Sequence, residues 1–205
     1  MTRIRKLIAL SQRVEISPAY GERRDALDQR WTAFLSACGY DALPMPNAGA
    51  AIGSWLEAIV PDGLIFTGGN DLAALGGAAP ERDATEESAL AWAVSHDLPV
   101  VGICRGMQFL AHRSGGILKQ IEGHAGTRHP VSGDVPDRIV NSYHRWAVTE
   151  VGEPWRILAR ALDGSIEAIK RDDRAHLGLM WHPERESPFL AADMEVMRHH
   201  LGANT

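Results

Sequence analysis

Segments with strand and helix patterns alternate through the first 116 residues, and this alternation constrains the fold more than any other feature. Apolar runs of strand length recur between longer segments whose apolar residues follow helical spacing. The strand-like runs are KLIALSQ, DALPMP, DGLIFTGGND and LPVVGIC, and the helical segments are 19–39, 50–60, 79–97 and 105–115. Strands that alternate with helices form a parallel sheet with helices on both faces. We therefore predict an α/β fold, a three-layer sandwich with a mostly parallel central sheet.

The pattern changes after residue 116, where strand-like runs follow one another with turns between them. The runs are 116–123, 137–151, 155–162, 165–173 and 176–182, and a last helical pattern covers 187–201. Strands without intervening helices predict an added antiparallel or mixed portion of the sheet. The chain shows no internal repeat, low-complexity tract or linker, so we predict a single domain over residues 1–205.

Composition and charge exclude several classes of protein. A net charge of −5 leaves no basic excess to neutralise phosphates, so we expect no nucleic-acid partner. No apolar run approaches the ~18 residues that a membrane span needs, and MTRIRKLIALSQRV lacks the cleavage site of a signal peptide. Cys38 and Cys104 do not make a disulfide framework. We expect a cytoplasmic protein, a monomer or homodimer, that acts on a small molecule.

Cys104 lies where an apolar strand gives way to a helix, in the sequence GICRGMQ. Ligands of open α/β sheets bind beyond the carboxyl ends of the strands. The N-terminus of a helix stabilises a thiolate there. Gly102 and Gly106 flank the cysteine and allow the tight turn of a nucleophile elbow. The alternative is that Cys104 is a small core residue, and this motif alone leaves both interpretations open.

His182 and Glu184 follow another apolar strand, in WHPERE. Pro183 keeps His182 out of the helical region, and residues i and i+2 of an extended segment project to one side. Glu184 could therefore orient the imidazole as the acid of a triad does. Glu186 competes for this role, but its side chain is less suited to reach. Each residue alone is most simply a surface residue, whereas together with Cys104 they favour a Cys-His-Glu triad.

The segment FTGGND, residues 66–71, ends a third strand at the same predicted edge. Glycine lets the main chain approach a ligand closely. The N–H groups of Gly69 and Arg105 could then stabilise an oxyanion. The alternative is an ordinary Gly-Gly turn.

GICRGMQ, WHPERE and FTGGND together resemble the class I glutamine amidotransferase superfamily, and the resemblance extends over nearly the whole chain. It implies a flavodoxin-like fold, a triad and an oxyanion hole at the positions given above, and no cofactor. The resemblance also implies that Gln108 and the VNSYH residues Asn141, Ser142 and Tyr143 hold the glutamyl part of the substrate. Asn70 replaces the usual proline after the second glycine, which resembles the γ-glutamyl hydrolase branch.

Further segments resemble bacterial γ-glutamyl-CDP-amidate hydrolases, and these are SQR, YGERRDALDQRW, EGHAGTRH, VNSYH and SIEA. The resemblance implies release of glutamate from a nucleotide-linked γ-glutamyl phosphoramidate in capsule synthesis. Similar γ-glutamyl-γ-aminobutyrate hydrolases usually have longer chains. Two further alternatives are a glutaminase subunit that supplies ammonia and a non-catalytic relative of the fold. We place Asn70, Arg13 and His129 among the substrate-binding residues.

An anionic nucleotide leaving group would need cationic partners, and arginine suits phosphate. Five arginines lie in or beside the segments of the predicted active edge, namely Arg13, Arg24, Arg105, Arg128 and Arg185. Any one of them is more simply a solvated surface residue. We leave open whether the Arg105 side chain meets phosphates or solvent.

The histidines His124, His129 and His144 raise the question of a metal site. Their spacing is not that of strong metal-ligand motifs, and no cysteine or paired carboxylate completes a set. We therefore predict no metal.

Overall fold

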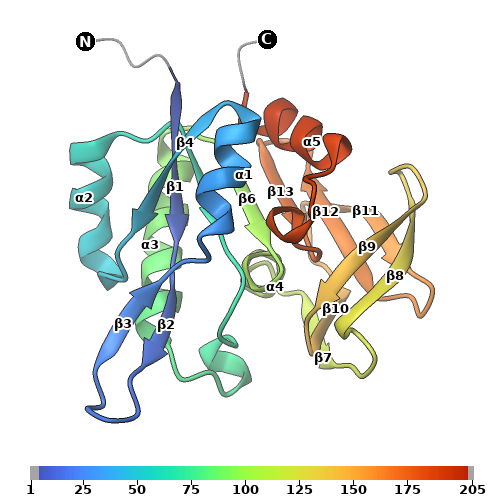
Figure 1. Ribbon diagram of the computed structural model, residues 1–205, viewed down its shortest axis with the longest axis horizontal. Helices are drawn as coiled ribbons and strands as arrows, with labels where there is room; N and C mark the ends of the chain where they lie inside the picture. The colour runs from blue at the N-terminus through green and yellow to red at the C-terminus, as the bar shows by residue number, and fades with distance from the viewer. Residues whose placement is uncertain (1–4, 203–205) are drawn as a thin grey trace.

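A sheet of 11 strands runs through the computed structural model, which describes residues 5–202 (Figure 1). Its parallel part has the strand order β4-β1-β5-β6-β13. These strands are β1 (Lys6–Ser11), β4 (Tyr40–Met45), β5 (Gly63–Phe66), β6 (Val100–Ile103) and β13 (His176–Leu179). Because carboxyl ends of parallel strands share one edge, the loops after β5, β6 and β13 lie together.

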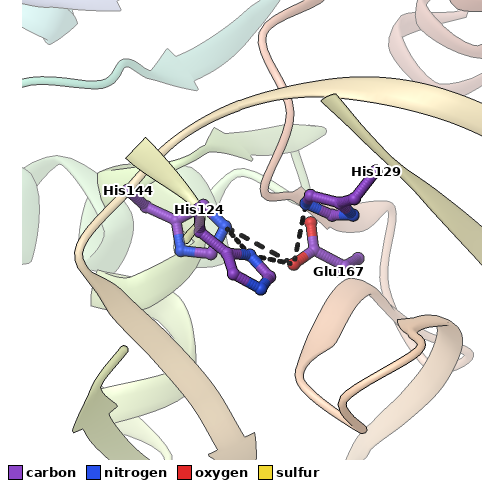
Figure 2. Close-up of side chains that lie close together, drawn as sticks. All are labelled: His124, His129, His144 and Glu167. Carbon is purple, nitrogen blue, oxygen red and sulfur yellow. Dashed lines mark hydrogen bonds and ion pairs between the residues drawn. The ribbon is translucent and has the colours of Figure 1, made fainter. Parts of the chain in front are cut away.

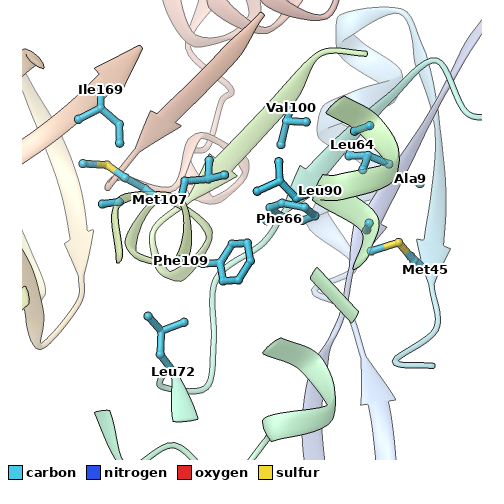
Figure 3. Close-up of a cluster of buried hydrophobic side chains, with 14 of the residues drawn as sticks. Ala9, Met45, Leu64, Phe66, Leu72, Leu90, Val100, Met107, Phe109 and Ile169 are labelled. Carbon is cyan, nitrogen blue, oxygen red and sulfur yellow. The ribbon is translucent and has the colours of Figure 1, made fainter. Parts of the chain in front are cut away.

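Helices cover both faces of the parallel part, so its strands are buried on both sides. Alternate residues of β1 enter different cores: Ala9 packs with α2, α3 and α4, whereas Ile8 and Leu10 pack with α1 and α5. Figure 3 shows the first core, with Phe66 and Phe109 in an edge-to-face contact. The helices are α1 (Arg30–Cys38), α2 (Ile52–Ile59), α3 (Pro80–Ser95), α4 (Arg105–Arg113) and α5 (Ala191–Leu201). The predicted three-layer α/β fold is confirmed.

The second half of the chain extends the sheet with antiparallel strands, as the turn-separated runs predict. From β13 the order continues β12-β11-β8-β9. Strand β10 forms a branch of the sheet, because it pairs with β12 on one side and with β7 on the other. The strands are β7 (Ile117–Gln120), β8 (Ala125–Gly133), β9 (Arg138–Tyr143), β10 (Trp146–Glu150), β11 (Trp155–Ala161) and β12 (Ile166–Arg171). They lie to the right of the parallel part in Figure 1. In the described part of the chain, no helix is long and apolar enough to cross a membrane.

One prediction of local structure is wrong, and one strand was missed. The helix predicted over 19–39 begins only at Arg30, and a separate hairpin of β2 (Arg13–Ile16) and β3 (Arg23–Ala26) precedes it. Strand β8 was not predicted either, because Val131 is its only buried residue. Both the hairpin and β8 expose most of their side chains, so the alternation of apolar and polar residues that marks a half-buried strand is absent.

Two glycines determine the joint between β6 and α4. A Cβ atom on Gly106 would lie 2.0 Å from the carbonyl oxygen of Phe66, and one on Gly102 would lie 2.6 Å from the Gly106 main chain. Cys104 between them has a φ of 52° and a ψ of −104°, a conformation that L-residues rarely adopt. The tight turn predicted around Cys104 is confirmed, and it places the cysteine at the N-cap of α4.

We expect Gly106→Ala to lower the free energy of unfolding by about 3 kcal/mol, because its methyl group would overlap a main-chain carbonyl. Gly53→Ala is the matched control. Gly53 is also the second residue of its helix, and a Cβ atom there would meet nothing within 4 Å. The control should be neutral or stabilising by up to about 1 kcal/mol. Denaturant unfolding measures both, and equal effects would contradict the packing argument.

Candidate active site

Cys104 and His182 meet across the ends of the neighbouring strands β6 and β13. The two strands pair in parallel, and the Cys104 N–H donates to the Leu179 carbonyl at 2.7 Å. The side chains of Cys104 and His182 are hydrogen bonded. His182 Nδ1 lies 2.7 Å from Glu184 Oε1, which leaves Nε2 as the ring nitrogen for the sulfur. The three predicted triad residues are thus in contact, and all are buried.

Glu184 reaches the imidazole by a different main-chain path from the predicted one. His182 is extended, with a φ of −109° and a ψ of 93°, as the following proline requires. Residues Pro183–Arg185 then form a 3₁₀ turn, so the expectation of an extended i, i+2 pair is wrong. The Glu186 carboxylate accepts a hydrogen bond from the Asn141 amide at 2.8 Å. It is Glu184, and not Glu186, that orients the ring.

The charges at this site favour a thiolate–imidazolium pair. Burial opposes a charged Cys104, but the charge of His182 and its hydrogen bond to the sulfur bring the pKa of the thiol below its ordinary value. Burial also opposes a charged His182, but Cys104 and Glu184 raise its pKa to about 9. In contrast, burial raises the pKa of the Cys38 thiol to about 11. Cys104 therefore has the electrostatic character of a nucleophile, and Cys38 has that of a core thiol.

Arg82 holds the Gly-Gly turn of the predicted oxyanion hole. Its fully buried guanidinium donates to the carbonyls of Thr67 at 2.6 Å, Gly68 at 3.0 Å and Gly69 at 2.6 Å. The N–H and C=O of a trans peptide point in opposite directions. The Gly69 N–H therefore points away from Arg82, and Gly69 lines the cavity that contains Cys104. This orientation suits the predicted role of Gly69 as an oxyanion donor.

Arg105 approaches the reacting atoms through its main chain. Its N–H forms a hydrogen bond to the Cys104 side chain. Its guanidinium is buried and forms ion pairs with Asp83 and Glu86. The side chain is therefore not solvated, and its charge is already paired within the protein.

A cavity of about 380 Å³ lies over Cys104 and is lined by several of the predicted substrate-binding residues. Gln108 lines it and donates to the Trp146 carbonyl at 2.8 Å. Tyr143 lines it too, and its ring meets the His182 ring edge to face at 5.5 Å. Ser142 is fully buried, and its hydroxyl has no hydrogen-bond partner among the described residues.

Two predicted substrate ligands have their side chains occupied by the protein. The Asn141 amide accepts from the His182 N–H at 2.8 Å and donates to the His182 carbonyl at 2.9 Å. The Asn70 amide bonds both the N–H and the carbonyl of Val14, at 2.8 and 3.0 Å. The Asn141 side chain therefore holds His182, and that of Asn70, which also lines the Cys104 cavity, holds the β2–β3 hairpin against the Gly-Gly turn. Contact of either residue with substrate stays a prediction.

The other predicted residues lie away from the cysteine cavity. Arg13 and Arg185 line a second cavity on the far side of the Gly-Gly turn, together with His182. Arg24 and Arg128 are exposed and pair with neighbouring carboxylates. His129 lies in the antiparallel half of the sheet, beside His124.

Several residues of the site were missed from the sequence. They are Arg82, Glu86, His144 as a cavity residue, and the rim residues Asp71 and Arg145. The available signal was weak: Arg82 and Glu86 are an i, i+4 pair among the many charged residues in the first half of α3.

Comparison with known proteins relates this geometry to a family. Residues 38–195 match the family model described as glutamine amidotransferase class-I. The chain belongs to this class I glutamine amidotransferase family. A Campylobacter jejuni protein named gamma-glutamyl-CDP-amidate hydrolase is 30% identical over 183 residues, which cover 88% of this chain and 90% of the relative. This membership supports hydrolysis of a glutamyl amide as the activity of the class I site.

Other proteins that match the chain are described as subunits of synthases. The carbamoyl phosphate synthase small chain of Halomonas eurihalina is 34% identical, with 69% of this chain and 39% of the relative covered. A solved structure from Thermoplasma acidophilum, described as a candidate GMP synthase subunit, aligns with a TM-score of 0.69. It covers 98% of this chain and 94% of that chain at 20% identity, a likeness that shows the fold alone. The class I glutamine amidotransferase-like fold predicted from the sequence is confirmed.

We expect iodoacetamide to alkylate Cys104 about 10-fold or more faster than Cys38 at pH 7. At pH 7 the thiolate fractions of Cys104 and Cys38 differ by more than this factor. The difference in rate is smaller, because a thiolate of lower pKa is intrinsically less nucleophilic. The pH midpoint of Cys104 alkylation should lie below the ordinary thiol value of 9.0, because the depressed pKa keeps the thiolate present at lower pH. In His182→Gln the midpoint should rise. Peptide mass spectrometry measures both rates, and an unshifted midpoint in the wild type would contradict the ion pair.

We expect Arg82→Lys to lower kcat for glutamyl amide hydrolysis about 10–100-fold with KM little changed, because one ammonium cannot span three carbonyls and misplaces an oxyanion donor. The alkylation rate of Cys104 should stay near that of the wild type. Arg113→Lys is the control, since Arg113 forms an exposed ion pair with Glu87. Steady-state kinetics of both variants decide the matter: an unchanged kcat in Arg82→Lys would show that Arg82 does not position the loop.

Proposed function

We propose that this protein is a cysteine-dependent hydrolase that releases glutamate from a γ-glutamyl amide, with γ-glutamyl-CDP-amidate as its substrate. The observation that carries the proposal is the contact of Cys104 with His182 and of His182 with Glu184, beside two main-chain N–H groups. This set contains a nucleophile, a proton carrier, its orienter and the donors for an oxyanion.

In the first half of the reaction, the Cys104 thiolate attacks the γ-carbonyl carbon. The N–H groups of Gly69 and Arg105 stabilise the oxygen as it becomes negative. The His182 imidazolium then donates its Nε2 proton to the leaving nitrogen, and the C–N bond breaks. The products are a glutamyl thioester on Cys104 and the free amine or phosphoramidate.

In the second half, neutral His182 takes a proton from water as the water oxygen attacks the thioester. The C–S bond breaks, the γ-carboxyl group of glutamate loses its proton to solvent, and the thiolate–imidazolium pair is restored. Glu184 holds the Nδ1 side of the ring throughout and stabilises its charge.

The surroundings of the triad support a two-part substrate. Asp71 and Arg145 lie at the cavity that contains Cys104, where opposite charges suit the amino and carboxylate groups of a glutamyl head. The second cavity reaches the other side of His182, and Arg13 and Arg185 supply its cations. These arginines suit a leaving group that carries phosphates, although Glu15 and Asp28 also line the cavity. The Campylobacter jejuni relative favours the cytidine-linked form. On this proposal the enzyme serves capsular phosphoramidate synthesis in the cytoplasm.

A glutaminase subunit is the second candidate, because the relatives include a small chain of carbamoyl phosphate synthase. It would act on glutamine and deliver ammonia to a synthase partner. Hydrolysis of γ-glutamyl-γ-aminobutyrate uses the same triad and differs only in the leaving group.

We expect glutamate release to have its highest kcat/KM with γ-glutamyl-CDP-amidate, compared with γ-glutamyl-γ-aminobutyrate and glutamine. Cys104→Ser should lower the rate by about 1,000-fold or more, because removal of a triad nucleophile leaves only binding and the oxyanion hole. Cys38→Ala is the control and should retain activity.

The comparison of the three substrates distinguishes between the candidate functions. Preference for glutamine, or activity only with an added partner, would favour the glutaminase subunit. Near-normal glutamate release by Cys104→Ser would overturn the nucleophile assignment for every substrate.

A further inference from the structure

Three histidines and one glutamate converge in the antiparallel half of the sheet, next to the candidate active site (Figure 2). His124 directly precedes β8, and His129 lies within it. His144 lies between β9 and β10 and lines the Cys104 cavity, and Glu167 lies in β12. Figure 2 shows the four side chains directed toward one another from these separate segments.

The spacing of the four inward atoms is that of metal ligands. Glu167 Oε1 lies 3.4 Å from His144 Nε2, 3.7 Å from His124 Nδ1 and 3.8 Å from His129 Nε2. His124 Nδ1 lies 3.2 Å from His144 Nε2, and all four atoms lie within 4.8 Å of one another. Tetrahedral zinc with bonds of about 2.0–2.1 Å separates its ligands by about 3.3–3.4 Å. Small movements of the four side chains would therefore place their inward atoms at the corners of a tetrahedron around a zinc ion.

The cluster also leaves polar atoms without partners. Glu167 is fully buried, and its Oε2 has no hydrogen-bond partner among the described residues. His129 Nε2 is also buried and without a hydrogen bond within that range. A buried carboxylate is costly unless a cation compensates it. A divalent cation at the centre would compensate the charge of Glu167 and engage the free lone pair of His129.

The outward nitrogen of each imidazole already faces an oxygen atom, as is usual for histidines that bind metals. The contacts are His124 with Asp163 Oδ2 at 2.9 Å, His144 with the Trp146 carbonyl at 3.1 Å and His129 with the Pro130 carbonyl at 3.5 Å. An outward nitrogen that donates its proton leaves the inward nitrogen with a lone pair. Inward lone pairs that face a carboxylate repel it, whereas a metal ion would bind all of them.

We propose that His124, His129, His144 and Glu167 bind a structural Zn²⁺ ion. Imidazole nitrogens favour zinc over calcium or magnesium, and four protein ligands with no open position are typical of a structural site. The ion would join the start of β8, the β9–β10 connection and β12, and would thereby fix His144 against the cavity of Cys104. The expectation of no metal rested on spacing along the chain, which does not bring Glu167 beside the histidines.

A proton-sharing network is the competing explanation of the same cluster. Burial lowers the pKa of His144, but the hydrogen bond and charge of Glu167 raise it above its ordinary value overall. One protonated histidine could then balance the carboxylate without a metal. The two explanations differ in zinc stoichiometry, which needs no knowledge of the substrate.

We expect the full chain, purified without a histidine tag, to contain or take up one Zn²⁺ per chain, measured by elemental analysis and by titration against a chromogenic chelator. Co²⁺ in place of zinc should give the visible absorption of tetrahedral cobalt. His129→Gln and Glu167→Gln should weaken zinc binding by more than the 10–100-fold typical of a lost supporting residue. His112→Gln is the matched control, since His112 is exposed on α4 and outside the cluster.

The outcomes are exclusive and do not depend on enzyme activity. One zinc per chain in the wild type and in His112→Gln, with loss in both cluster variants, supports the site. A wild-type chain that binds no zinc, or cluster variants that bind it as tightly as the wild type, overturns the site. His129 is the least buried ligand, so His129→Gln remains informative if Glu167→Gln does not fold.

Discussion

The two predicted oxyanion donors depend on one buried carboxylate, that of Glu86 in α3. It pairs with Arg82, which holds the carbonyls of the Gly68-Gly69 turn, and with the side chain of Arg105. The loop after β5 and the first turn of α4 are thus fixed by the same group. Removing one partner of such a buried pair typically costs about 3–5 kcal/mol, although an apolar replacement of the whole set is often neutral. The contribution of the set therefore lies in geometry more than in net stability.

The features that the sequence predicted share one physical property, which is strong burial. The parallel strands are apolar on both faces, so KLIALSQ and LPVVGIC stand out as continuous runs. Each polar motif that follows such a run lies at the carboxyl end of its strand, which is why Cys104 and His182 could be placed together from the sequence alone. Pro183 and the paired glycines around Cys104 added local conformational limits that the structure confirms.

The features that the sequence did not predict arise from contacts between distant segments. In the sequence, Arg82 belongs to a helical segment rich in charged residues. Only the packing of α3 against the loop after β5 shows that the Arg82 side chain is buried. Asn141 was assigned to substrate, whereas its amide bonds the main chain of His182 from β9, a strand that is not paired with β13 in the sheet. Exposed strands such as β8 have no periodic apolar signal, so His129 and Glu167 could not be brought together from the sequence.

The two halves of the sheet divide the work of the site. Under the proposed function, the loops after the parallel strands supply the nucleophile, the proton carrier and the oxyanion donors, and they contain the motifs that resemble the family. The antiparallel half supplies Tyr143, His144 and Arg145, which line the cavity over Cys104. The antiparallel half also holds the main chain of His182, through the hydrogen bond from the His182 N–H to Asn141. The cavity proposed for the leaving group is lined instead by Arg13 of the β2–β3 hairpin and by Arg185. A change of leaving group can therefore arise there without a change in the residues around Cys104, so the motifs indicate the reaction more readily than the leaving group.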